Sequence, residues 1–318
     1  MNTLATAARH PAASETLLRR LWIYQADRFP LGKTALLLAV FSAASISVSA
    51  HLAGRSLPSV WTFVVAWLVA IIILFQIRAC DEYKDLEDDR RFRPERPIPS
   101  GLVSLRLILF LALAGGVAAV LLTASLSMAL LLPLLLVWFW LGLMTAEFFA
   151  PQWLKARPFL YLVSHMAIMA LIDLYVTGAE WLPHGVWPPQ GLWLFLGLSF
   201  VNGCVLETGR KIWAPESERA GVETYSGLLG PAKAVWLWAA FCALAWCLLA
   251  GVGVAVGTPL AIVVPATLML FVVGAAAADF ARSPTPGKQK RVDLLAGLWV
   301  FVCYALAGFA PYLSERFA

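Results

Sequence analysis

Apolar stretches long enough to cross a membrane recur along the whole sequence. A transmembrane helix needs about 20 predominantly apolar residues. Stretches of this kind can be placed at residues 32–53, 58–80, 102–124, 126–147, 158–178, 191–209, 234–256, 259–280 and 293–313. Apolar residues make up 61% of the chain and charged residues 14%, against about 45–50% and 25% in a soluble domain. The sequence therefore predicts an all-α, polytopic membrane protein with about nine transmembrane helices.

Basic residues are distributed unevenly among the segments that connect these stretches. With the N-terminus placed inside, all of the 24 Lys and Arg residues except Arg55 and Arg316 fall at the inner side. Because cytoplasmic segments of membrane proteins are enriched in Lys and Arg, we expect a cytoplasmic N-terminus and a C-terminus outside, in an inner (plasma) membrane of bacterial type. The net charge of +5 then reflects topology, and we expect no nucleic-acid partner.

The segment before the first apolar stretch has two parts. Residues 1–14 are small and polar and lack the apolar core of a signal peptide, so we expect a disordered tail and not a cleaved signal. In residues 16–28, apolar side chains alternate with arginines in the pattern of a helix that lies in the membrane surface. We expect residues 1–318 to form a single transmembrane domain.

A charged stretch directly follows the second apolar stretch. It carries six acidic residues from Asp81 to Asp89, then a cluster of arginines that ends at Arg96, and it closes with Pro-Ile-Pro-Ser-Gly. If the helix continues through the acidic residues, Asp81, Asp85 and Asp89 share one face. Such a face repels itself unless it binds a cation, and Mg²⁺ prefers oxygen ligands, often carboxylates together with substrate phosphates. The arginines could hold the remaining phosphate oxygens, or the stretch could be a solvated loop.

At these residues the sequence resembles the UbiA superfamily of intramembrane prenyltransferases. The first motif of that family is Asn-Asp-x-x-Asp-x-x-x-Asp, followed by Arg-Pro-x-x-Ser-Gly. Asp81 takes the place of the asparagine, Glu82, Asp85 and Asp89 take the places of the three aspartates, and the second part begins at Arg96. The resemblance implies a bundle of nine helices, Mg²⁺ binding by the four acidic residues, catalytic roles for Asp85 and Asp89, and diphosphate binding by Arg96.

The segment after the fourth apolar stretch also resembles the family. There the family carries Tyr-Ser, then prolines, then Leu-Lys, and its lysine contacts the substrate diphosphate. Lys155 matches that lysine, while the tyrosine is replaced by Phe148 or Phe149. The resemblance makes Lys155 a candidate for diphosphate binding and catalysis. The alternative is that Lys155 and Arg157 are basic anchors at the inner membrane face.

A second charged stretch begins at Glu207, at the end of the sixth apolar stretch. Its residues 221–224, Gly-Val-Glu-Thr, match the end of the second family motif, but the aspartate positions of that motif carry other residue types. Either Glu207 and neighbouring glutamates supply metal ligands, or Arg210 and Lys211 bind the phosphates. Because Glu207 lies one helical turn before Lys211, we expect the two to pair when no substrate is bound.

Two ionisable residues fall inside the fifth apolar stretch. Such side chains cost about 2.5–3.5 kcal/mol each within a bilayer, so they normally face a polar cavity or a partner. His165 and Asp173 lie eight positions apart, on roughly one helical face. We expect Asp173 to line the acceptor end of a cavity and to be catalytic, although a neighbouring helix could simply cap it; the expectation for His165 is weaker.

These features together predict a magnesium-dependent enzyme embedded in the membrane. As a prenyltransferase, it would move an isoprenoid group from its diphosphate to a lipid-soluble acceptor, an aromatic quinone precursor in the first instance, and no protein partner is evident. Transfer of a phosphopentose onto a polyprenyl phosphate, which some relatives perform with the same fold, is an alternative. A carrier or permease is less favoured, because the acidic residues cluster at one membrane face and not along a path across it.

Overall fold

The computed structural model describes residues 15–317, so the tail expected at residues 1–14 lies outside the described residues. Within residues 15–317 the regular structure is helical, without strands, and nine helices are long and apolar enough to cross a membrane. The all-α prediction and the predicted number of membrane helices are both confirmed. The nine long helices are α2 (Leu31–Leu52), α3 (Val60–Lys84), α5 (Leu105–Leu126), α6 (Leu131–Thr145), α8 (Pro158–Trp181), α9 (Leu192–Arg210), α11 (Pro231–Ala255), α12 (Pro259–Arg282) and α13 (Pro286–Phe317).

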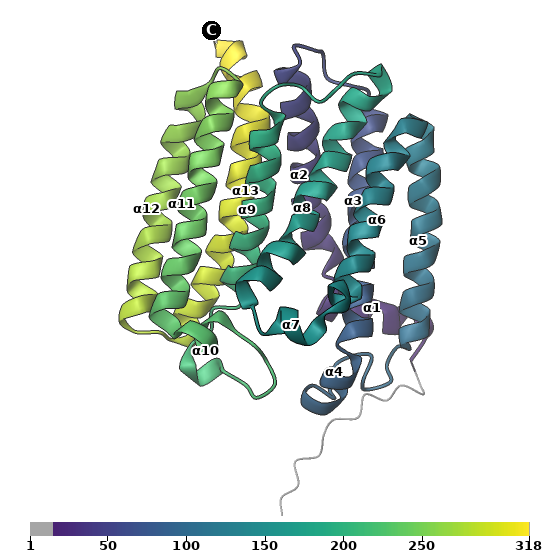
Figure 1. The fold of residues 1–318 in the computed structure, drawn as a ribbon, viewed down its shortest axis with the longest axis vertical. Coiled ribbons are helices and arrows are strands. Elements are labelled where there is room, and N and C mark those ends of the chain that lie inside the picture. The colour runs from purple at the N-terminus through teal and green to yellow at the C-terminus, as the bar shows by residue number, and fades with distance from the viewer. Residues whose placement is uncertain (1–14, 318) are drawn as a thin grey trace, which may run out of the picture.

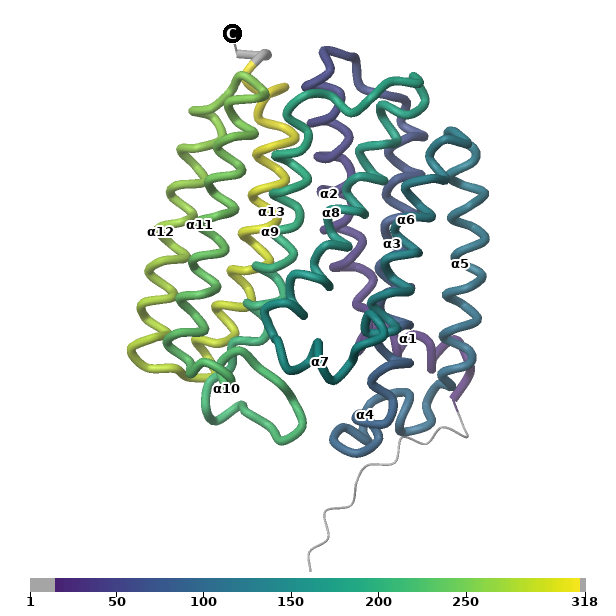
Figure 2. The backbone as a smooth tube through the Cα atoms, viewed as in Figure 1, coloured from purple at the N-terminus to yellow at the C-terminus, as the bar shows by residue number. Residues whose placement is uncertain are grey.

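Four short helices lie at one end of this bundle, which we call the charged end (Figure 1). They are α1 (Leu17–Arg28), α4 (Leu86–Phe92), α7 (Pro151–Lys155) and α10 (Tyr225–Leu229). The backbone trace shows α7 between the segment that holds α10 and the segment that holds α4, whereas the C-terminus lies at the opposite end (Figure 2). Because α3 and α9 both run toward the charged end, both charged stretches of the sequence lie there.

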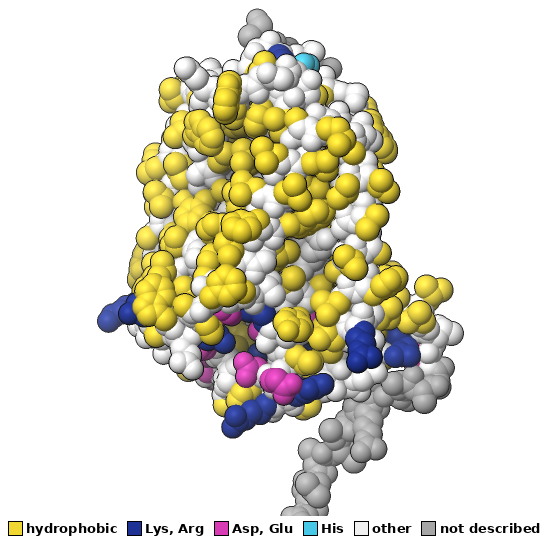
Figure 3. Space-filling model, turned by 45° about the vertical axis from the view of Figure 1, so that its right-hand side comes forward, with side chains coloured by type: hydrophobic (Ala, Val, Ile, Leu, Met, Phe, Trp, Pro, Cys, Tyr) yellow, Lys and Arg dark blue, Asp and Glu magenta, His cyan; other side chains and the backbone are white. Residues whose placement is uncertain are grey.

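The hydrophobic core lies where the long helices contact one another. α2 packs against α8 and α13, α8 packs against α9, and α9 packs against α11 and α13. The largest fully buried side chains of this core include Trp238, Trp299, Tyr175 and Phe195. On the outside, apolar side chains cover the wall of the bundle, while lysines, arginines and acidic side chains gather at the charged end (Figure 3). This division is typical of a protein whose wall faces lipid.

The helix predicted at residues 16–28 is confirmed as α1. Thr16 caps it by accepting a hydrogen bond from the backbone nitrogen of Arg19 at 3.4 Å. Tyr24 is buried with apolar residues of the loop before α5, whereas Leu18 and Trp22 are 81% and 70% exposed. α1 thus attaches to the first charged loop by one face and presents apolar side chains on the other. Its place in a membrane surface stays a prediction.

The prediction that one helix continues through all the acidic residues is wrong. α3 ends at Lys84, and Asp85 caps it with φ −88° and ψ 1° before α4 starts at Leu86. These dihedral angles depart from those of an α-helix, so the chain turns at Asp85. Asp89 therefore lies on a separate helix from Asp81.

Candidate functional site

Two of the predicted metal ligands are buried among arginines. Glu82 and Asp89 are only 3% and 2% exposed. Arg28 donates a hydrogen bond to Glu82 at 2.6 Å, and Arg96 donates to both carboxylate oxygens of Asp89 at 2.9 and 2.7 Å. Arg93 adds an ion pair with Asp89 at 3.1 Å. Both carboxylates are thus neutralised by the protein itself, and Arg96, expected to bind diphosphate, is engaged with Asp89.

This arginine cluster joins α1 to the first charged loop. Burial opposes the charge on Arg28, but the hydrogen bond and charge of Glu82, together with the charge of Asp89, hold the pKa of Arg28 above its usual value. The interaction energy of such pairs rises as water is excluded. Glu82, Asp89 and Arg28 therefore form a persistent structural unit that fixes α1 against the end of α3.

The remaining acidic residues of the first motif have a different environment. Asp81 lies on the last turn of α3, with its carboxylate 3.6 Å from Arg78. It interacts electrostatically with Asp85 and with Arg210 at the end of α9. Asp81 and Asp85 are both half-buried. The first motif thus splits into a buried structural pair, Glu82 and Asp89, and a half-buried pair, Asp81 and Asp85, of which Asp81 interacts with Arg210 of the second charged stretch.

The end of α9 carries the cations that face these acidic residues. Glu207 forms ion pairs with Arg210 at 2.6 Å and with Lys211 at 2.9 Å, so the expected pairing of Glu207 with Lys211 is confirmed. Gly209 permits this position, because a Cβ atom there would lie 2.5 Å from the Cβ of Ala296 on α13. Close packing against α13 therefore fixes where Arg210 and Lys211 emerge.

The two charged loops approach each other directly. Gly221, with φ +76°, lies against the ring of Phe92 on α4, and a Cβ atom at Gly221 would come within 2.6 Å of that ring. Further along, the Thr224 hydroxyl accepts from the backbone nitrogen of Gly227 at 2.9 Å and donates to Glu218 at 2.6 Å. The Gly-Val-Glu-Thr segment thus joins the loops and caps α10, and its threonine engages a neighbouring glutamate.

Two predicted site residues lie apart from this arrangement. Lys155 ends α7 at the charged end, is exposed, and forms no ion pair within residues 15–317. Asp173 is fully buried and accepts a hydrogen bond from Ser199, which in turn accepts one from Tyr304 at 2.9 Å. It lies about 22 Å along α8 from the residue at which α8 begins, at about 1.5 Å per residue. The roles expected for Lys155 and Asp173 stay predictions.

A polar cluster that the sequence did not predict lies between α3, α8 and the segment after α6. The ammonium group of Lys84 lies 2.8 Å from Glu147 and 3.3 Å from the hydroxyl of Tyr161. Tyr161 stacks on His165 with ring centroids 3.8 Å apart. The one sign of this cluster in the sequence was Glu147, an acidic residue at the end of an apolar stretch. Its partners could not be identified because they come from helices distant in sequence.

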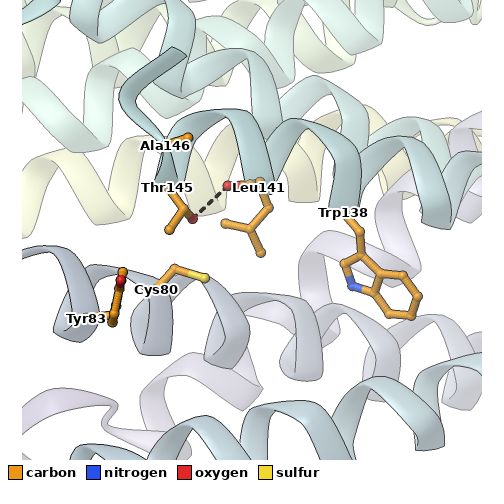
Figure 4. A pocket seen from close by; sticks show the side chains of 7 residues that line it. Cys80, Tyr83, Trp138, Leu141, Thr145 and Ala146 are labelled. Carbon is orange, nitrogen blue, oxygen red and sulfur yellow. Dashed lines mark hydrogen bonds between the residues drawn. The ribbon is translucent and has the colours of Figure 1, made fainter. Parts of the chain in front are cut away.

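An open, mainly apolar cavity lies along the last turns of α3. It has a volume of about 640 Å³ and lies between the end of α3 and the second half of α6. Cys80 and Tyr83, which line it, flank Asp81 on α3, and they face Thr145 and Leu141 of α6 (Figure 4). A mainly apolar chain could lie here with its polar end close to the charged residues.

The acidic side chains at the charged end differ in whether they are free to bind magnesium. Glu82, Asp89 and Glu207 each form an ion pair of 2.6 or 2.7 Å with an arginine. No group of three or more His, Cys, Asp and Glu side chains suited to a metal ion occurs within the described residues. Asp81 and Asp85 remain, and magnesium commonly takes one or two carboxylates together with substrate phosphates. These two residues fit a magnesium ion that binds together with a diphosphate, and the larger set does not form a preassembled cage.

Nine helices in the described part of the chain are long and apolar enough to cross a membrane, and with a charged site at one end they define a polytopic membrane protein. The sequence matches the UbiA prenyltransferase family over residues 39–301, and the chain belongs to that family. The predicted family membership is thereby confirmed. No curated protein matches the sequence.

Solved structures of UbiA homologues share the fold. An apo homologue from Aeropyrum pernix K1 superposes with a TM-score of 0.66 at 19% identity, covering 87% of this chain and 98% of that one. A homologue from Archaeoglobus fulgidus, bound to DMAPP and Mg²⁺, has a TM-score of 0.55 at 14% identity, covering 87% and 97%. A digeranylgeranylglyceryl phosphate synthase has a TM-score of 0.61 at 12% identity, covering 91% and 98%. At these identities the similarity establishes the fold.

Proposed function

We propose that this protein transfers an isoprenoid group from its diphosphate to a lipid-soluble acceptor inside the membrane, an aromatic quinone precursor in the first instance. One observation carries the proposal: at the charged end, Asp81 of the first motif, with Asp85 one helical turn further on, interacts electrostatically with Arg210 at the end of α9. Family membership and the A. fulgidus homologue solved with DMAPP and Mg²⁺ support this reading.

In this proposal Asp81 and Asp85 hold a magnesium ion that arrives with the diphosphate. Bound there, magnesium would neutralise negative charge on the diphosphate. Glu82 and Asp89 hold the loop in shape through Arg28, Arg93 and Arg96, and therefore act on the site indirectly.

Arg210 and Lys211 bind the diphosphate oxygens in this proposal. Both are paired with Glu207 at 2.6 and 2.9 Å, so Glu207 keeps them at the site until a more highly charged anion arrives. Lys155 at the end of α7 could supply a further cation from the same end of the bundle. When the bond between the first isoprenoid carbon and the diphosphate oxygen breaks, its electron pair stays with the diphosphate, and fixed cations stabilise that charge.

The apolar part of the substrate has a place in the same region. The open cavity of about 640 Å³ between α3 and α6 is lined mainly by apolar side chains and includes Cys80, the residue before Asp81 (Figure 4). An isoprenoid chain lying there would pack against these apolar side chains.

The test uses the purified full-length chain in lipid nanodiscs with radiolabelled geranyl diphosphate and a panel of aromatic acceptors. We expect magnesium-dependent binding and consumption of the diphosphate by the wild type. Asp85→Asn should lower turnover by about 10²-fold or more, and Arg210→Gln should weaken diphosphate binding about ten-fold, since a charge-assisted hydrogen bond contributes about 1.5–3 kcal/mol.

Two exposed residues of the same loops provide matched controls. Asp88→Asn and Arg219→Gln remove the same groups from positions outside the proposed site, and both variants should behave as the wild type. A wild-type protein that neither binds nor consumes geranyl diphosphate would contradict the proposal. Equal activity in all variants would show that Asp85 and Arg210 have no role in the proposed reaction.

A further inference from the structure

The polar cluster of Lys84, Glu147, Tyr161 and His165 has no role in the function proposed above. It lies next to the diphosphate site, because Lys84 is the residue before Asp85, and Tyr161 interacts electrostatically with Asp81, Asp85 and Glu207. We call it the Glu147–His165 cluster. Its members come from the end of α3, the segment after α6 and the first turns of α8.

The backbone around Glu147 adopts a rare conformation. Glu147, Phe148 and Phe149 have φ angles of 50°, 51° and 59°, three consecutive left-handed residues without a glycine. This conformation costs roughly 1–2 kcal/mol for each such residue. It turns Glu147 inward, where the residue is 8% exposed, and it places the ring of Phe148 against Trp140 and His165 at centroid distances of 5.5 and 6.0 Å. Strain of this kind is concentrated at functional sites.

Two buried polar atoms of the cluster have no hydrogen-bond partner within the described residues. They are Oε2 of Glu147 and Nε2 of His165, and the two residues are 8% and 7% exposed. Nearly all buried polar atoms in native proteins are paired, and an unpaired one costs about 1–3 kcal/mol. A strained turn that buries an unpaired carboxylate oxygen, in the same cluster as an unpaired imidazole nitrogen, indicates that a ligand completes the cluster.

The partners of the other polar atoms define the chemistry of that ligand. Nδ1 of His165 lies 2.9 Å from the backbone oxygen of Tyr161; since a carbonyl can only accept, Nδ1 carries the proton and Nε2 is left as an acceptor. Oε1 of Glu147 is held by Lys84 at 2.8 Å, so Oε2 is also left as an acceptor. Two acceptors require a ligand that donates hydrogen bonds, and an ionised carboxylate cannot do so because it only accepts.

From this geometry we propose that Oε2 of Glu147 and Nε2 of His165 each accept a hydrogen bond from a hydroxyl group of the acceptor substrate. Lys84 holds Glu147 and the stacked ring of Tyr161 holds His165, so Lys84 and Tyr161 act as positioning residues. The acceptor is then a neutral hydroquinone or diol, which carries two donors, and a compound that must present a carboxylate here is excluded. This proposal depends on the proposed prenyl transfer in one respect only: it identifies the ligand of the cluster as the acceptor of that reaction.

Binding is measured on the full-length chain in lipid nanodiscs, with three probes: menadiol kept reduced under nitrogen, its dimethyl ether, and monoolein as an alcohol. We expect the wild type to bind menadiol or monoolein at least about ten-fold more tightly than the ether. Glu147→Gln and His165→Phe should each weaken binding of the hydroxyl compound about ten-fold, while the ether and geranyl diphosphate bind as to the wild type. His165→Phe keeps an aromatic ring against Tyr161, so it tests the nitrogen and not the packing.

Glu180→Gln is the matched control. Glu180 is also a buried glutamate in an ion pair, with Arg55 at 2.5 Å, but it lies at the other end of α8, and its substitution should leave all affinities unchanged. Equal binding of ether and hydroxyl compounds, unchanged binding by both cluster variants, or an equal loss for every probe would overturn the proposal. If the wild type binds menadiol as expected but never geranyl diphosphate, the prenyl-transfer proposal fails and the hydroxyl site stands.

Discussion

At the scale of single residues, the first motif divides its acidic side chains between two tasks. Glu82 and Asp89 are buried with arginines, whereas Asp81 and Asp85 are half-buried and Asp81 interacts electrostatically with Arg210 at the end of α9. The division follows from the turn at Asp85, which places Asp89 on α4 and brings it to Arg93 and Arg96. Substitutions of similar residues in one motif should therefore have different physical consequences.

Asp89→Asn should lower stability more than it affects chemistry. It removes the negative charge that neutralises Arg93 and Arg96, and breaking a buried pair costs about 3–5 kcal/mol. We expect a loss of this order in the free energy of unfolding, measured by denaturant titration in detergent. Asp88→Asn on the exposed side of α4 should change stability by less than about 0.5 kcal/mol. A fully stable Asp89→Asn protein that has lost magnesium dependence would assign Asp89 to the metal instead.

At the scale of elements, the site depends on how closely α9 approaches α13. The two helices pack together, and Gly209 allows the end of α9 to lie against Ala296. Helix ends are normally held by capping and packing, and α9 ends in residues that the proposed function uses. Small changes in packing here should therefore reach Arg210 and Lys211 without altering their chemistry.

Gly209→Ala is expected to disturb this contact. The added methyl group would lie 2.5 Å from the Cβ of Ala296 and 3.1 Å from Nε1 of Trp238, and overpacking of this kind costs about 1–3 kcal/mol. We expect lower stability and weaker binding of geranyl diphosphate. Gly297→Ala, where a Cβ meets nothing within 4 Å, is the control and should be neutral or slightly stabilising. If both variants bind and unfold like the wild type, the approach of α9 to α13 does not set the site.

At the scale of the whole molecule, all charged loops with a proposed role lie at one end of the bundle (Figure 1). The uneven distribution of basic residues predicts that this end is cytoplasmic. The opposite end carries the C-terminus and the buried pair of Glu180 with Arg55. The bundle therefore has two chemically distinct ends, and its orientation decides from which compartment the diphosphate is taken.

Introduced cysteines would test this orientation. With Ser217→Cys in the second charged loop and Pro183→Cys after α8, a membrane-impermeant maleimide applied to intact cells should label only the second. Labelling of the first should require permeabilised cells. The native chain contains five cysteines, of which Cys247 is exposed, so the unmodified chain is the baseline. Labelling of Ser217→Cys from outside would reverse the orientation.

The sequence by itself determined the architecture, because apolar stretches of spanning length can be satisfied in lipid only by helices or closed barrels, and their lengths fit helices. It also identified the charged stretches that α3 and α9 bring to one end, and the pairing of Glu207 with Lys211, since that contact is local to one helix. Family motifs read at this level place the candidate site in the two charged stretches, and this placement stays a prediction.

Only the tertiary structure decided which of those residues face one another. Arg28 contacts Glu82, which lies 54 positions away in the sequence, and Lys84 contacts Tyr161, which lies 77 positions away. The periodicity of a sequence cannot predict contacts between residues so far apart. The turn at Asp85 and the left-handed residues from Glu147 to Phe149 are likewise held by packing, because their local preferences alone would favour other conformations. Local physics thus fixed the helices, and contacts between distant helices fixed the chemistry of the site.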